Sequence, residues 1–68
     1  MPLNGAAEMV DPQQSDLGRP VVYTGNRYPG GLPEMGVVTS FNQSSVFVRY
    51  GNDVYSKATS REDLEWWG

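Results

Sequence analysis

The fold is decided by three consecutive stretches: Val46-Phe47-Val48-Arg49-Tyr50, Gly51-Asn52-Asp53 and Val54-Tyr55-Ser56-Lys57-Ala58-Thr59. The first and the third are rich in β-branched and aromatic residues, as half-buried strands are. The second joins them with a tight turn, because Gly adopts a left-handed backbone freely and Asn and Asp tolerate it. The sequence therefore predicts an antiparallel hairpin over residues 46–59.

The hairpin assigns its side chains to two faces. Successive residues of a strand point to opposite sides, so an inward Val48 puts both of its neighbours outside. A three-residue turn pairs Val48 with Ser56, whereas a register shifted by one residue would place Lys57 inside at a cost in desolvation. The expected outward set is Phe47, Arg49, Tyr55 and Lys57.

Short apolar runs separated by turn residues continue on both sides of this hairpin. Residues 25–34 hold three Gly and two Pro, which predicts one long loop. Residues 60–63 place a hydroxyl three positions before a carboxylate, as at a helix start, and the few residues that follow leave room for a 3₁₀ turn only. The predicted strands are residues 19–24, 35–41, 46–50, 54–59 and 64–67.

The second of these strands leaves its inward set open. Gly36 predicts a bulge or a sharp bend near the start of the strand. A bulge resets the alternation of faces. The inward side chains are therefore either Val37 and Phe41, or Val38.

Residues 1–17 differ in composition from the rest of the chain. They contain no aromatic residue, and their large apolar side chains are few. The free energy gained by burying so little apolar surface does not offset the conformational entropy lost when the segment is ordered. We expect a flexible, disordered N-terminal tail over residues 1–17 and a folded domain over residues 18–68.

SH3-like barrels have the element order strand, long loop, three-strand meander, 3₁₀ turn and strand. Closure of such a barrel removes exposed sheet edges. The predicted fold is a small all-β, five-stranded SH3-like barrel with a 3₁₀ turn before the last strand. The stretches 36–40, 46–50 and 58–64 resemble a pattern in small uncharacterised proteins of bacteriophages and prophages. This resemblance covers residues 18–65 and implies the fold, but it implies no activity.

The composition excludes several kinds of site. The chain has no Cys and no His, which removes disulfides, thiolate nucleophiles and the commonest metal ligands. No two acidic residues have the spacing of a catalytic pair, and the serines have no general base to activate them. We expect no enzymatic activity and no cofactor. No apolar run is long enough to span a bilayer and no signal segment is recognisable, so we expect a soluble, cytoplasmic protein.

The aromatic residues and the charges give the functional expectation. The chain has two Phe, two Trp and four Tyr, more than so small a barrel can bury, and exposed aromatic side chains on one face mark protein interfaces. The sequence predicts an adaptor or inhibitor-like module that binds a protein, and the resemblance implies that this partner belongs to a phage or its host. The expected binding surface is Phe47, Arg49, Tyr55, Lys57 and Trp67. The alternative is a nucleic-acid-binding barrel; residues 19–68 hold five basic and five acidic residues, which neither favours nor excludes a polyanion.

Overall fold

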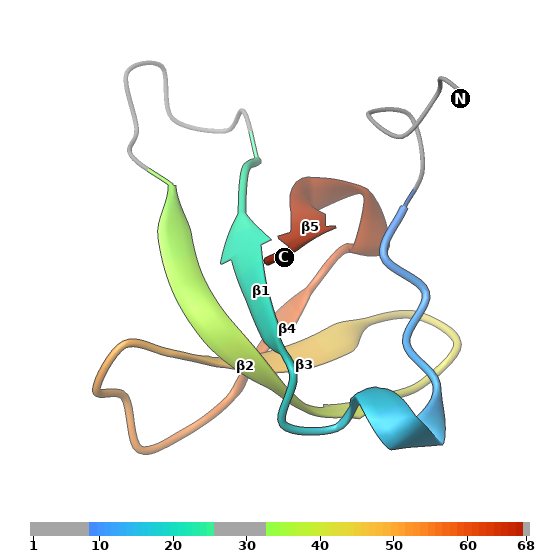
Figure 1. Ribbon diagram of the computed structural model, residues 1–68, viewed down its shortest axis with the longest axis horizontal. Helices are drawn as coiled ribbons and strands as arrows, with labels where there is room; N and C mark the ends of the chain where they lie inside the picture. Colours follow the sequence, from blue (N-terminus) through green and yellow to red (C-terminus); the bar gives the residue numbers. More distant parts are fainter. Residues whose placement is uncertain (1–8, 26–32, 68) are drawn as a thin grey trace.

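The computed structural model describes residues 9–25 and 33–67 (Figure 1). Two 3₁₀ helices, η2 (Gln14–Asp16) and η3 (Arg61–Asp63), precede the first and the last strand. No helix in this described part of the chain is long and apolar enough to cross a membrane. The strands are β1 (Pro20–Tyr23), β2 (Glu34–Phe41), β3 (Val46–Tyr50), β4 (Lys57–Thr59) and β5 (Leu64–Trp66).

The five strands form one antiparallel sheet in the order β4-β3-β2-β1-β5. Strands β1 to β4 make a meander, and β5 returns to pair with β1. Figure 1 shows a strongly curved sheet in which β1 and β2 cross in front of β3 and β4. The predicted small all-β fold, with a 3₁₀ turn before the last strand, is confirmed. β4 and β5 are the edges of the sheet, and no pairing between them closes it among the described residues.

The β2–β3 turn is the predicted hairpin turn, and Asn42 fixes it. Its side-chain oxygen accepts hydrogen bonds from the N–H groups of Ser44 and Ser45, both at 2.8 Å. Its own N–H donates to the carbonyl of Ser45 at 2.9 Å. Asn favours such turns because its short side chain substitutes for a backbone acceptor. The long loop predicted between β1 and β2 lies largely outside the described residues.

A bulge in β2 determines which of its side chains face inward. Val38 pairs with Val48, but the next pair is Ser40 with Phe47, so Thr39 is the extra residue. Because the bulge resets the alternation, both the fully buried Val38 and the partly buried Phe41 contribute to the core. The alternative with Val38 inward is therefore correct, whereas of Val37 and Phe41 only Phe41 packs against the core. The bulge lies at Thr39 instead of Gly36.

The β3–β4 register differs by one residue from the predicted one. Val48 pairs with Lys57 instead of Ser56. The connection is longer than predicted, since β4 begins only at Lys57 and residues 51–56 lie outside any strand. This register buries no charge, because Lys57 lies on an edge strand with its side chain 69% exposed and its Nζ 3.6 Å from Asp53 Oδ2.

The N-terminal segment is packed against the sheet from residue 10 onwards, which differs from the expected tail. Val10 is 2% exposed and belongs to the core, and its N–H donates to the carbonyl of Arg61 at 3.2 Å. Gly18 N–H donates to the carbonyl of Val38 at 2.7 Å. One buried valine and isolated backbone hydrogen bonds leave no periodic pattern, so composition alone could not reveal this packing. Residues 1–8 lie outside the described residues.

The core lies on the inward side of the curved sheet and draws on every strand except β4. Its members are nearly all aliphatic, and Tyr23, Phe41 and Trp66 pack around them. The core residues are Val10, Val21, Val38, Val46, Val48, Tyr50 and Leu64. The outward side of the sheet is therefore left to contact solvent or a partner.

Candidate functional site

Cross-strand partners place four side chains in one row on the outward side of the sheet. Trp67 follows β5 and its N–H donates to the carbonyl of Pro20 at 3.2 Å. Pro20 pairs with Val37, and Val37 pairs with Arg49. Directly opposed residues project to the same side of a sheet. At an inter-strand spacing of about 4.8 Å, the row is about 15 Å long.

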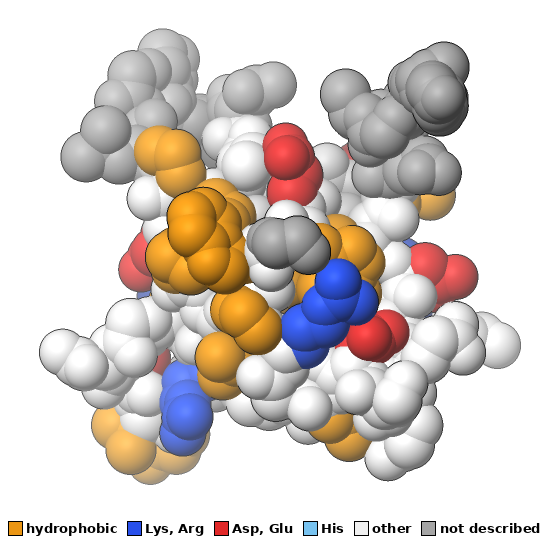
Figure 2. All heavy atoms as spheres, viewed as in Figure 1, with side chains coloured by type: hydrophobic (Ala, Val, Ile, Leu, Met, Phe, Trp, Pro, Cys, Tyr) orange, Lys and Arg blue, Asp and Glu red, His pale blue; other side chains and the backbone are white. Residues whose placement is uncertain are grey.

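Two more apolar side chains lie beside this row. Val22 pairs with Met35 across β1 and β2, and both residues alternate with inward ones. Trp67 is 58% exposed and Met35 is 44% exposed. Figure 2 shows apolar side chains gathered over β1 and β2, with basic side chains on either side. We call this surface the outer patch; it consists of Pro20, Val22, Met35, Val37, Arg49 and Trp67.

Arg49 differs from the other basic side chains of the described residues. Each of the others has an acidic neighbour: Arg19 Nη1 lies 3.2 Å from Asp16, Lys57 Nζ lies 3.6 Å from Asp53, and Arg61 Nε lies 3.6 Å from Asp11. Arg49 is exposed and has no acidic partner in the described part of the chain. The outer patch therefore ends in a cation whose charge is available to a ligand.

Arg19 serves the fold rather than the outer patch. Its guanidinium carbon lies 4.2 Å from the centre of the Trp66 ring, which is partly buried against the core. It also donates to Asp16, whose Oδ2 accepts the N–H of Gln13 at 2.8 Å. The Gln13 hydrogen bond, with a smaller contribution from Arg19, holds the pKa of Asp16 below its usual value. Asp16 thus stays ionised and keeps Arg19 in place.

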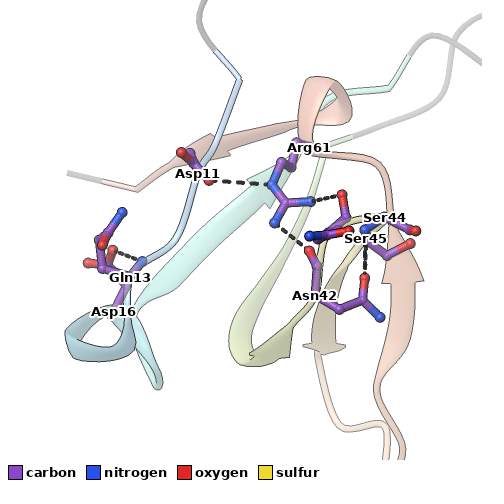
Figure 3. Close-up of polar contacts among 8 residues, drawn as sticks. Asp11, Gln13, Asp16, Asn42, Ser44, Ser45 and Arg61 are labelled. Atoms are coloured by element: carbon purple, nitrogen blue, oxygen red, sulfur yellow. Dashed lines mark hydrogen bonds and ion pairs between the residues drawn. The ribbon is translucent and has the colours of Figure 1, made fainter.

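Arg61 joins the N-terminal segment to the β2–β3 turn (Figure 3). Its guanidinium donates to the carbonyl oxygens of Asn42 at 2.6 Å and Gln43 at 3.2 Å. Its side chain is only 18% exposed, although the carbonyl oxygens that it contacts lie in an exposed turn. Arg61 therefore connects Asp11, the turn after β2 and η3, and its role is structural.

Arg61→Ala is expected to lower the free energy of unfolding by about 2 kcal/mol, because hydrogen bonds from a charged donor contribute about 1.5–3 kcal/mol. Urea denaturation followed by tryptophan fluorescence measures the change. Arg49→Ala is the matched control, and it should alter stability by less than about 0.5 kcal/mol, since Arg49 is exposed. Equal losses in the two variants would contradict a structural role for Arg61.

The predicted site residues do not form one surface. Phe47 and Arg49 share the outward side of β3, and Trp67 lies on the same side of the sheet at its other end. Tyr55 is 83% exposed but lies in the connection of residues 51–56, outside the sheet. Lys57 pairs with the inward Val48 and so projects to the opposite side. The longer connection after β3 accounts for the position of Tyr55, and the one-residue change in register accounts for that of Lys57.

The outer patch also contains apolar residues that the sequence did not single out: Pro20, Val22, Met35 and Val37. The first two alternate with the buried Val21, and the last two flank the buried Gly36. Their orientation follows from the alternation in β1 and from the position of the β2 bulge. The sequence did not reveal the position of the bulge, and this position decides the orientation of Met35 and Val37.

Comparison with protein-family models, with curated proteins and with solved structures found no match. The resemblance to small bacteriophage and prophage proteins therefore stays a prediction. Among residues 9–25 and 33–67, no three acidic side chains are grouped so as to hold a metal ion.

Proposed function

We propose that this protein is a small non-enzymatic binding module that docks a partner protein, of a phage or its host, on the outer patch. The supporting observation is the uncovered row across β1, β2 and β3, which places the 58% exposed Trp67 at one end and Arg49 at the other. Trp, Met and Arg are enriched at the centres of protein interfaces. The outer patch combines these three residue types on one face.

The chemistry of the outer patch suggests the kind of segment that binds it. The apolar side chains between Trp67 and Arg49 favour an apolar segment, because burying them removes apolar surface from water. Arg49 has no acidic partner among the described residues, so a carboxylate of the partner would complete its contacts in a bidentate arrangement. The partner segment is therefore apolar and carries an Asp or Glu next to its apolar residues.

The charges support protein binding over the nucleic-acid alternative. Nucleic-acid affinity comes largely from neutralising several phosphates with Lys and Arg. Three of the basic side chains in the described segments already have acidic neighbours. Lys57 and Arg49 also lie on opposite sides of the sheet, so they do not contribute to one basic surface.

Affinity capture of the tagged full chain from a bacterial lysate, with and without nuclease, tests this function. A protein retained after nuclease treatment is expected from the unmodified chain. The double variant Trp67→Ser with Met35→Ser should weaken its capture by about 30-fold, since interface hot spots contribute about 2 kcal/mol or more. Tyr55→Ser removes an aromatic side chain of 83% exposure outside the patch and should leave capture unchanged. Loss of all partners with nuclease, or equal capture by both variants, would contradict the proposal.

A further inference from the structure

The free edge of β4 is not part of the outer patch. β4 (Lys57–Thr59) pairs with β3 on one side and with no strand of the described residues on the other. Lys57 and Ala58 are exposed at this edge. An uncovered edge strand presents backbone N–H and C=O groups to which a further strand can add. The alternation of hydrogen bonds along β3 decides which of these groups are available on β4.

The odd-numbered residues of β3 direct their backbone groups to β2. The carbonyl of Phe47 accepts the hydroxyl of Thr39, a β2 residue, at 3.1 Å. The N–H of Gly51, directly after β3, donates to the carbonyl of Met35 in β2 at 3.2 Å. In an antiparallel sheet, the backbone groups of successive residues point alternately to the two neighbouring strands. The even-numbered residues of β3 therefore direct their backbone groups to β4.

This alternation leaves the backbone groups of Ala58 without a partner on β3. Val48 opposes Lys57, so these two residues exchange the ladder hydrogen bonds. Val46 and Thr59 do the same two residues further along β3. Ala58 lies between the two bonded pairs, and its N–H and C=O point away from β3. The centre of the exposed edge is therefore a residue with one backbone donor, one backbone acceptor and the smallest side chain that a strand can carry besides glycine.

The edge is complementary to itself. When a second copy runs antiparallel, with a two-fold axis between the two Ala58 residues, these residues exchange N–H···O=C bonds. Lys57 then faces Thr59 of the second copy and does not meet another Lys57. Lys on an edge strand commonly prevents such pairing, but the Nζ atom of Lys57 lies 3.6 Å from Oδ2 of Asp53 in its own chain. The charge of Lys57 is thus partly offset before a second copy approaches.

Apolar side chains beside the edge also favour a second copy. Phe47 lies directly opposite Ala58 and is half-buried on the outward side of the sheet. Pairing two copies places Phe47 and Ala58 of each in one outward row, about 14 Å long at an inter-strand spacing of about 4.8 Å. The association thereby covers apolar surface that each copy leaves exposed. β5, the other edge of the sheet, is less suited, because the N–H of Leu64 already donates to the carbonyl of Arg61.

We propose that two copies of this protein associate through their β4 edges, antiparallel and centred on Ala58, and join their sheets into one. The N–H of Ser60 lies on the same edge by alternation and bonds to the carbonyl of Ser56 in the second copy. The interface is small, and interfaces below about 1,200 Å² are typical of weak, transient complexes. The dimer carries two outer patches on one side of the joined sheet. The association itself uses groups outside the outer patch, so either proposal can fail without the other.

Sedimentation equilibrium of the full chain tests the association. We expect a monomer at about 10 µM and a weight-average mass that rises towards that of a dimer at about 1 mM, as for a Kd of a few hundred micromolar. Ala58→Pro should stay monomeric, because it removes the edge N–H but no ladder hydrogen bond, and edge strands tolerate Pro at such positions. Ala58→Ser keeps the N–H and should associate as the unmodified chain does. A monomer at the highest concentration, or equal association of the two variants, would overturn the proposal.

Introduced cysteines test the pairing without the Pro variant, and the chain has no Cys of its own. Directly opposed residues have Cα atoms about 5.5 Å apart, which suits a disulfide. With oxidised glutathione as the oxidant, Ala58→Cys should crosslink at least about tenfold faster than Tyr55→Cys, since pairing raises the local concentration of the thiols. Tyr55 is 83% exposed, so random collisions do not disfavour it, and equal rates would overturn the proposal. A mixture of Ser56→Cys and Ser60→Cys should give mainly the mixed disulfide, whereas an excess of the two symmetric disulfides would contradict antiparallel pairing.

Discussion

Val10→Asp is expected to lower the free energy of unfolding by about 2–3 kcal/mol, which is the stabilisation expected from burying a valine. Val10 is 2% exposed within the core, and a carboxylate there would lie in apolar surroundings without a partner. The N-terminal segment would detach from the sheet rather than bury that charge. The loss of the Val10 contacts therefore sets the size of the effect. For so small a domain this is a large share of the total stability.

Met9→Asp is the matched control for this substitution. Met9 is the preceding residue and is 59% exposed, so its replacement should change stability by less than about 0.5 kcal/mol. Urea denaturation of both variants measures the difference. Hydrogen exchange should in addition show faster exchange of the residue-10 amide, which donates to the carbonyl of Arg61. Equal stability of the two variants would mean that residues 9–17 behave as the flexible tail that the composition predicts.

Gly36→Ala is expected to destabilise the protein by about 3 kcal/mol, the upper end for overpacking in a core. Ala normally stabilises a strand relative to Gly by about 0.5–1 kcal/mol, so the expected sign is the opposite of the usual one. A Cβ on Gly36 would lie 2.5 Å from Cγ1 of Val48 and 2.7 Å from the carbonyl oxygen of Arg49. The second of these atoms belongs to the backbone of β3 and cannot move without separating β2 from β3.

Gly51→Asn provides the comparison for the Gly36 substitution. Gly51 has a φ of +49°, but a Cβ at this position would have no atom within 4 Å. The cost of Asn is therefore conformational only, at most about 1 kcal/mol, because Asn visits this region more readily than other residues. Thermal denaturation should show a much larger loss for Gly36→Ala. A Gly36→Ala variant as stable as the unmodified chain would contradict the close approach of β2 and β3.

The sequence predicts strands well where alternation is unbroken. Residues 46–50 alternate without interruption, and β3 has the predicted bounds, with Val46, Val48 and Tyr50 buried as expected. The ends of β1 and β5 lie within one residue of the prediction, and the 3₁₀ turn before β5 is present as η3. In each case the information is local, since neighbouring residues set both the strand and its faces.

Prediction from the sequence fails where the insertion of one residue changes the register of a strand. The connection after β3 is longer than the three-residue turn that Gly51-Asn52-Asp53 suggests, so β4 pairs one residue away from its predicted position. The bulge at Thr39 likewise has no signal in residue type, because Thr is an ordinary strand residue. The register decides the face of Lys57, and the bulge decides the orientation of Met35 and Val37 in the outer patch. Long-range packing sets both of them.

Site-specific photo-crosslinking tests the central claim, that partner proteins bind on the outer patch, most directly. A photoreactive benzoylphenylalanine replaces Trp67 in one version of the chain and Tyr55 in another, and both are irradiated in bacterial lysate. Both positions are exposed, at 58% and 83%, but only Trp67 belongs to the outer patch. We expect a discrete protein crosslink at position 67, retained after nuclease treatment and absent at position 55. Crosslinks of equal yield at both positions, or at position 55 alone, would contradict the account.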